Sequence, residues 1–113
     1  MAAFSELQRK VVKFRDDRDW AQFHDPKDVA ISLSLEANEL LELFQWRNGP
    51  DAAKERRAEI GDELADVFYW TLLMAHDLDI DLERALSAKL EKNAKKYPVE
   101  KARGSAKKYT ELG

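Results

Sequence analysis

Two pairs of acidic residues are the side chains of this sequence that are best placed to do chemistry. Glu36 and Glu39 stand three positions apart in AISLSLEANELLELFQW, which covers residues 30–46. Glu63 and Asp66 repeat this spacing in EIGDELADVFYWTLLMAHDL, which covers residues 59–78. Since both segments have helical periodicity, the two acids of each pair face one side of a helix and can share a ligand.

These acids lie toward the apolar side of their helices, where an unpaired charge costs on the order of several kcal/mol. Glu36 falls between Leu40 and Leu43 on a helical wheel, and Glu63 falls between Trp70 and Met74. The two apolar arcs comprise Leu33, Ala37, Leu40, Leu43 and Phe44 in the first segment, and Ile60, Leu64, Val67, Phe68, Thr71, Met74, Ala75 and Leu78 in the second. If the helices pack antiparallel, the four carboxylates converge, and repulsion raises at least one pKa unless a cation lies among them.

Oxygen ligands without a thiolate or an imidazole suit a hard ion, Mg²⁺ or Mn²⁺. Mg²⁺ prefers a few carboxylates together with waters and phosphate oxygens, which indicates phosphoryl chemistry on a nucleotide. Chance is the competing explanation, because the chain has 22 acidic residues and the same spacing recurs at Glu39 and Glu42. A di-iron site is less favoured, because it typically needs Glu-x-x-His, and Ala21 and Leu73 stand three places before His24 and His76.

The elements that must position these acids are all expected to be helices. SELQ at Ser5 is a capping-box candidate, and Leu7, Val11 and Phe14 form an apolar side behind it. Asp25 before Pro26 and Asp81 are further start signals, and Gly61 is a point at which a helix can bend or break. The four expected helices run over 5–19, from 26 to the NGP segment at 48–50, over 51–78 and from 81 to 98. This pattern predicts an all-α fold of four-helix-bundle type, or a helical hairpin that associates with copies of itself.

Bulk properties predict one domain over residues 1–113, with about 99–113 as an extended C-terminal tail. The 113 residues are 44% hydrophobic and 36% charged, which favours a compact helical structure. The chain has no cysteine, no apolar run of membrane-spanning length and no secretory signal pattern, so we expect a soluble cytoplasmic protein. The net charge of −3 gives no attraction to nucleic acid polymers or to acidic membranes.

At these residues the sequence resembles a known family. EANELLELFQW followed by DELADV resembles the ExxE…ExxD signature of the all-α nucleoside triphosphate pyrophosphohydrolases, the MazG-like group. RDWAQFHDP, ELFQW, ELADV, KLEKNAKKYP and ARGSAKKYTEL are similar, in the same order, to its dCTP pyrophosphatase branch, from about Phe14 to Leu112. The resemblance implies Mg²⁺-dependent hydrolysis between the α and β phosphates, which gives a monophosphate and pyrophosphate. It also implies a homo-oligomer, a tetramer or a dimer.

The resemblance implies roles for individual residues as well. The metal ligands and catalytic groups would be Glu36, Glu39, Glu63 and Asp66. An aromatic base pocket would involve Trp20, Gln22, Phe23, His24, Trp46 and Trp70. The phosphate side would be contacted by Lys89, Asn93 and Lys96, and by Lys107, Lys108 and Tyr109 of the tail. Judged without the resemblance, a Trp is more often a core residue, except Trp20 in its polar connector, and the lysines are more often a solvated face.

Departures from the dCTP-directed pattern leave the preferred base open. Val11 stands where those relatives have a base-recognising His, and Trp70 stands where they usually have Tyr. The loop around NGPDAAKERR is also shorter than in those relatives. We therefore expect dCTP or a modified, for example 5-substituted, cytosine nucleotide as the substrate. The alternatives are dUTP, dTTP or a non-canonical purine nucleotide with the same chemistry, or a non-catalytic module that binds nucleotide or metal.

Overall fold

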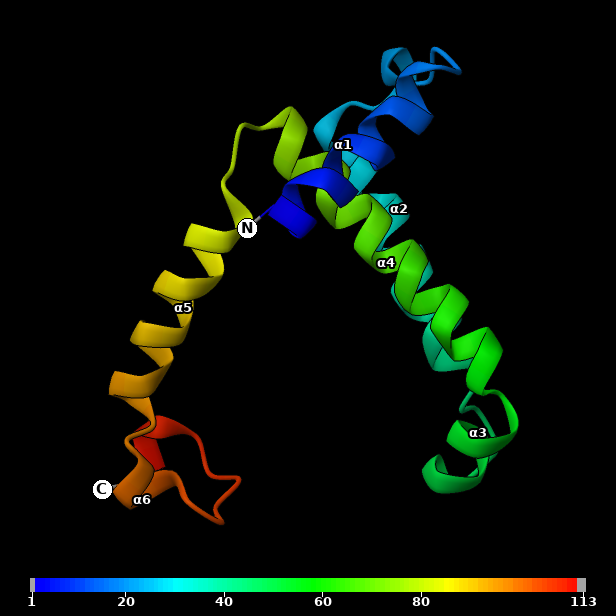
Figure 1. Cartoon of the computed structure of the whole chain (residues 1–113). Coiled ribbons are helices and arrows are strands. Elements are labelled where there is room, and N and C mark those ends of the chain that lie inside the picture. Colours follow the sequence, from blue (N-terminus) through cyan, green and yellow to red (C-terminus); the bar gives the residue numbers. More distant parts are fainter. Residues whose placement is uncertain (1, 112–113) are drawn as a thin grey trace. The chain divides into compact units, whose positions relative to one another are not determined.

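Helices make up the structure, a computed structural model that describes residues 2–111 (Figure 1). In chain order they are α1 Ala2–Asp16, the 3-10 turn η1 Ala21–Phe23, α2 Pro26–Glu42, α3 Gly49–Glu55, α4 Arg57–Asp77, α5 Leu82–Lys96, α6 Val99–Ala102 and the 3-10 turn η2 Tyr109–Glu111. No strand occurs in the described range, and the expected all-α fold is confirmed. The chain divides into two compact units, one ending at Ile80 and the other beginning at Asp81.

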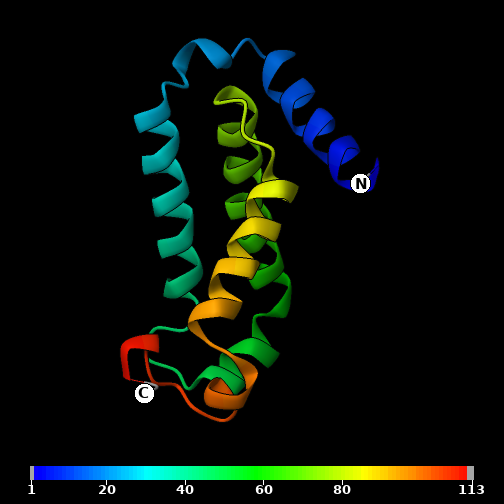
Figure 2. The same ribbon diagram turned by 90° about the vertical axis from the view of Figure 1, so that its left-hand side faces the viewer.

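In the first unit, α2 and α4 run antiparallel along each other, and α1 packs against α4 (Figures 1 and 2). The fully buried apolar side chains are Val29, Ala52, Leu72, Leu73 and Ala75. Leu72 and Leu73 lie outside the expected apolar arc of α4. They are buried because α4 has neighbours on two sides, and the Gln8 amide of α1 donates to the Leu72 carbonyl at 3.1 Å.

Two of the expected start signals act as helix caps. An Asp25 carboxylate oxygen accepts from the backbone N–H groups of Lys27 at 2.7 Å and Asp28 at 3.2 Å, with Pro26 in the first turn of α2. Asp81 accepts from the backbone N–H of Arg84 at 3.1 Å and caps α5. These predictions are confirmed, because a capping side chain satisfies backbone donors that the helix itself leaves unpaired.

Three expected boundaries differ from the structure. The capping box at Ser5 is wrong, because Ser5 lies inside α1, which begins at Ala2. α2 ends at Glu42, before the NGP segment, and the following residues form a turn. The third helical region breaks at Arg56 and not at Gly61, which lies within α4. The break is set by packing: the short α3 folds against α4 and buries Ala52 completely.

One ion pair fixes the C-terminal end of α1 to the C-terminal end of α4. Arg15 is 4% exposed, and its Nη1 donates to both carboxylate oxygens of Asp77, at 2.9 and 2.7 Å. The Arg15 carbonyl also accepts from the backbone N–H of Trp20 at 3.2 Å. The connector that carries Trp20 is therefore tied to the same point.

The second unit contains α5, α6 and η2. Tyr109 packs edge-on against Tyr97 with 6.0 Å between ring centroids, and the Lys96 ammonium lies 4.9 Å from the Tyr109 ring centroid. These contacts fold the tail back onto the end of α5. Leu112 and Gly113, the end of the expected tail, lie outside the described residues, and the single domain over 1–113 stays a prediction. Across residues 2–111, no helix has the length and apolar character needed to cross a membrane.

Candidate active site

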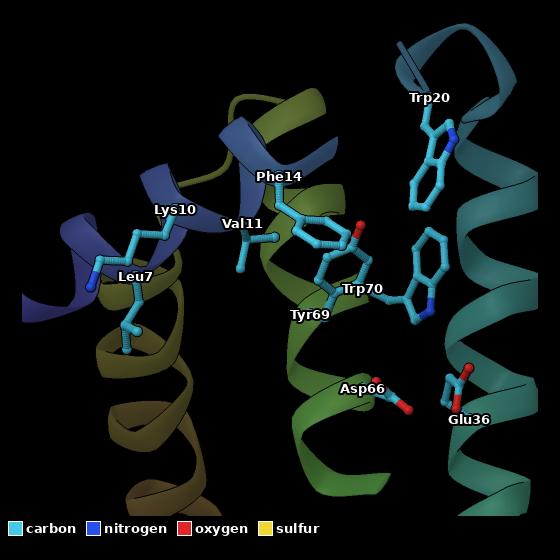
Figure 3. A pocket seen from close by; sticks show the side chains of 9 residues that line it. All are labelled: Leu7, Lys10, Val11, Phe14, Trp20, Glu36, Asp66, Tyr69 and Trp70. Carbon is cyan, nitrogen blue, oxygen red and sulfur yellow. The ribbon is translucent and has the colours of Figure 1, made fainter. Parts of the chain in front are cut away.

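The antiparallel packing of α2 and α4 brings carboxylates from both helices together. Carboxylate oxygens of Glu36, Glu39 and Glu63 all lie within 4.8 Å of one another. Glu36 and Glu63 are half-buried, and Glu39 is exposed. Asp66 lies outside this group of three but faces Glu36 across the gap between the helices (Figure 3).

The electrostatics of the cluster are those of acids held too close together. Burial raises the pKa of Glu36 to about 7, with further contributions from the neighbouring Glu39, Asp66 and Glu63 carboxylates. Burial is also the largest cause of the raised pKa of Glu63, and the charge of Glu39 is the second cause. One buried oxygen of Glu36 and one of Glu63 have no hydrogen-bond partner among residues 2–111. Such a donor set fits a divalent cation, which would supply the missing positive charge.

A cavity of about 540 Å³ adjoins these acids (Figure 3). It is lined by Leu7, Lys10, Val11, Phe14, Trp20, Glu36, Asp66, Tyr69 and Trp70. Glu36 and Asp66 form its acidic end, and the aromatic side chains gather at the other end, with Trp20 above Trp70 (Figure 3). A flat aromatic group with an anionic tail matches this polarity if a cation lies at the acidic end.

Comparison with known proteins agrees with this geometry. The model of the MazG-like family matches residues 31–112. This chain belongs to the MazG-like family. Among similar proteins, dCTP pyrophosphatase 1 of Rattus norvegicus is 40% identical over 112 residues, and dCTP pyrophosphatase 1 of Homo sapiens is 38% identical over 112 residues. Each alignment covers 95% of this chain and 66% of the relative, so the chain spans about two thirds of their length.

A solved structure of a similar protein supports the same assignment. The crystal structure of a pyrophosphatase from Archaeoglobus fulgidus DSM 4304 superposes on this MazG-like chain with a TM-score of 0.80 and 38% sequence identity. The superposition covers 85% of this chain and 93% of that chain. The likeness therefore extends from the sequence to the helical fold.

The structure places the predicted base-pocket residues of this MazG-like chain in two groups. Trp20 and Trp70 line the cavity. Gln22, Phe23 and His24 do not: Gln22 donates to the backbone and side chain of Asp19, Phe23 is 65% exposed, and the His24 ring contacts Trp70. Trp46 is 94% exposed and follows the opposite end of α2.

Several cavity residues were not among the predicted site residues. They are Leu7, Lys10, Val11, Phe14 and Tyr69. The signal for three of them was present, because Leu7, Val11 and Phe14 share the apolar side of the first helix. Periodicity marks such a side as covered, but it does not tell whether a neighbouring helix or a ligand covers it.

The predicted phosphate contacts belong to the second unit. Lys89, Asn93 and Lys96 follow one another on α5 at spacings of four and three, which places them on one helix face. Asn93 is half-buried, whereas both lysines are exposed. Lys107, Lys108 and Tyr109 lie in the tail that folds back on α5. Their contact with a triphosphate stays a prediction.

Proposed function

We propose that this MazG-like chain hydrolyses a nucleoside triphosphate between its α and β phosphates, with dCTP or a 5-substituted cytosine nucleotide as the substrate. The observation that carries the proposal is the cluster of Glu36, Glu39 and Glu63 beside an aromatic cavity. The similar proteins named dCTP pyrophosphatase 1 support this choice of substrate. We also infer a cytoplasmic location, because the sequence contains no cysteine and the substrate belongs to the nucleotide pool.

The cofactor we propose is Mg²⁺, which Mn²⁺ can replace, held by Glu36, Glu39, Glu63 and Asp66. The bound ion would neutralise charge on the phosphate oxygens and acidify the attacking water. The carboxylates hold the reacting groups in place, and one of them orients the water or accepts its proton. The half-buried position of Glu36 and Glu63 keeps bulk water away from these oxygens and strengthens their interaction with a cation.

The aromatic end of the cavity would hold the base. Trp20 and Trp70 offer indole surfaces, and stacking on an aromatic side chain contributes about 1–3 kcal/mol per base. Since the acidic end of the same cavity is formed by Glu36 and Asp66, the base and the phosphates would occupy opposite ends. The lysines of α5 and of the tail stay predicted phosphate contacts on the ground of the family resemblance alone.

We propose further that the chain works as a homo-oligomer, a dimer or a tetramer, in which Trp46 serves the cavity of a partner copy. The 17 residues of α2 span about 25 Å at 1.5 Å per residue, and Trp20 precedes this helix whereas Trp46 follows it, so we do not expect one base to contact both within one chain. Trp46 also has a positive φ of 66°, a strained conformation for a bulky residue. Exposed apolar side chains on α2, namely Ile31, Leu35 and Leu41, offer further surface for a neighbour.

The test of the activity is a panel of deoxynucleoside and nucleoside triphosphates, assayed for pyrophosphate release with and without Mg²⁺. We expect release to require Mg²⁺, to be fastest with cytosine nucleotides and to vanish in Glu63→Gln. If pyrophosphate release is fastest with dUTP, dTTP or a purine nucleotide, the proposed reaction stands and the proposed substrate is wrong. Binding without any release would assign the chain to the non-catalytic class.

The test of the assembly is light scattering combined with mixing of two impaired variants, assayed at a nucleotide concentration below the KM of the wild type. A Trp46→Ala chain and a Glu63→Gln chain each lack one part of every site in their own oligomers. Mixed oligomers recover activity if Trp46 acts on a partner copy, because some sites then receive both intact parts. A monomer in light scattering, or no recovery after subunit exchange, would contradict the proposal.

A further inference from the structure

His24 lies behind the aromatic end of the cavity and not in its lining. Its ring contacts the Trp70 indole edge-on, with 5.1 Å between centroids and 68° between planes. Trp70 lines the cavity, and His24 does not. A side chain placed in this way touches a residue of the cavity wall without lining the cavity itself.

The Trp70 indole has ring contacts with two residues. Tyr69 packs against it at 5.2 Å and 86°, so His24 and Tyr69 each present an edge contact to the same ring. The contacts continue from Tyr69 to Phe14 at 6.1 Å and from Phe14 to Trp20 at 5.9 Å. Edge-to-face pairs fix the relative angle of two rings, so removal of one pair frees the next ring in the series.

The backbone of His24 is held at a defined place. Its N–H donates to the Ala21 carbonyl at 3.0 Å, and the next residue, Asp25, is the cap of α2. A ring on such a segment is already ordered before a ligand arrives, which lowers the entropy cost of fixing the indole.

The imidazole is in a setting that favours its neutral form. Its Nδ1 atom is buried and accepts no hydrogen bond within the described part of the chain. Burial lowers the pKa of His24, the charge of Arg15 lowers it further, and Asp77 opposes this change. A neutral imidazole carries no charge that favours full exposure to water, so it can stay in edge contact with the indole.

We propose that His24 is a positioning residue that holds the Trp70 indole at the angle at which it stacks on the base. It acts through ring contact and not through a hydrogen bond to the base edge. This inference rests on the proposed function, since it assigns the base to the Trp70 end of the cavity. Other residues of the cavity then discriminate among bases, and His24 affects how tightly every base binds.

Three substitutions separate ring contact from hydrogen bonding. His24→Ala removes the ring, His24→Phe keeps a ring without polar atoms, and His24→Asn keeps a polar group without the ring. We expect Ala and Asn to raise KM for the best nucleotide by roughly 3- to 10-fold, the effect of one lost aromatic pair. Phe should keep KM within about twofold of the wild type, and kcat should change little in all three. Retention of KM by Asn but not by Phe would overturn the proposal.

Matched controls assign the effect to the base end. His76→Ala, which changes the exposed histidine near the end of α4, should leave KM unchanged. Inhibition by inorganic pyrophosphate should be equal in all His24 variants, because that probe has no base. A general loss of structure would instead weaken inhibition by pyrophosphate and lower the melting temperature of every variant, including Phe.

A spectroscopic readout keeps this inference separate from the proposed function. Near-ultraviolet circular dichroism reports the fixed surroundings of the indoles without any substrate. The tryptophan bands should change in His24→Ala and return in His24→Phe, whether or not the wild type releases pyrophosphate. An unchanged spectrum in His24→Ala would overturn the positioning role, whereas absence of pyrophosphate release from the wild type would overturn the enzymatic assignment alone.

Discussion

The acid cluster and the aromatic cavity share Glu36 but are built in different ways. The acid cluster uses only α2 and α4, whose antiparallel packing brings Glu36 and Glu39 together with Glu63. The aromatic cavity needs α1 and the connector that carries Trp20 as well, and the Arg15–Asp77 ion pair ties both to α4. In the proposed enzyme this difference separates chemistry from recognition, because α1 and its connector would change the fit of the base without moving the acids.

The largest effect on activity is expected in the acid cluster. Glu36→Gln replaces a negatively charged metal ligand with a neutral amide. We expect kcat to fall roughly 100-fold or more, because the loss of one electrostatic contact to the transition state has an effect of this size. The same substitution relieves repulsion, so the metal-free variant should melt at a higher temperature than the wild type above pH 7. Steady-state kinetics and calorimetry measure the two effects. A variant that loses both activity and stability would show that Glu36 is structural.

A second prediction concerns the fixation of α1. Arg15→Met leaves the Asp77 carboxylate, whose side chain is 25% exposed, without its partner, and loss of such a charge-assisted hydrogen bond costs about 1.5 kcal/mol. We expect a lower denaturant midpoint and weaker nucleotide binding, because Phe14 and Trp20 lose their fixed place. The double variant Arg15→Met with Asp77→Leu should recover most of the stability. Equal instability of the single and double variants would contradict this role of the ion pair.

The acid cluster could be predicted from the sequence because it follows from one-dimensional spacing. A pair at i and i+3 faces one side of any helix, and two such helices in antiparallel packing require no further information. The caps at Asp25 and Asp81 were predictable for a similar reason, since they depend on local hydrogen bonds.

The aromatic cavity could be predicted only in part because it depends on packing. Trp20 and Trp70, to which the family resemblance gives a role in base binding, line the cavity, whereas Phe14 and Tyr69 belong to it through the position of α1 on α4. His24 and Trp46 were assigned to the same pocket, but the structure places one behind Trp70 and the other beyond the far end of α2. Sequence spacing gives the face of a helix and leaves its neighbour undetermined.

A third prediction tests the recognition side alone. Trp20→Ala removes one indole surface from the cavity, and we expect KM for the best nucleotide to rise roughly 10-fold, within the about 1–3 kcal/mol range for loss of a stacked base. The value of kcat should change much less, because Glu36, Glu39 and Glu63 keep their places. Trp20→Phe, which retains a ring, is the matched control. A fall in kcat without a rise in KM would place Trp20 in the chemistry and remove the separation between the two regions.

The smallest effect is the pH dependence of stability without metal, and its sign distinguishes the two regions. The pKa of Glu36 is raised from 4.5 in the unfolded chain to about 7 in the folded chain, so the folded state binds more protons between these values. The free energy of unfolding therefore falls as pH rises through this window, by about 1 kcal/mol after allowance for screening by solvent. His24 acts in the opposite sense, because its lowered pKa makes folding more favourable as pH rises toward 6.5.

Comparison of the wild type with Glu36→Gln removes the contribution of His24, which is common to both. Calorimetry between pH 5 and 8 should give a wild-type melting temperature that declines relative to the variant, by about 4 °C over the window. Added Mg²⁺ should cancel the decline, because a cation among the acids favours their charged forms. Parallel pH profiles for the two proteins would mean that Glu36 is solvated as an ordinary surface acid. The acidic end of the cavity would then not differ from the aromatic end in the pH dependence of its stability.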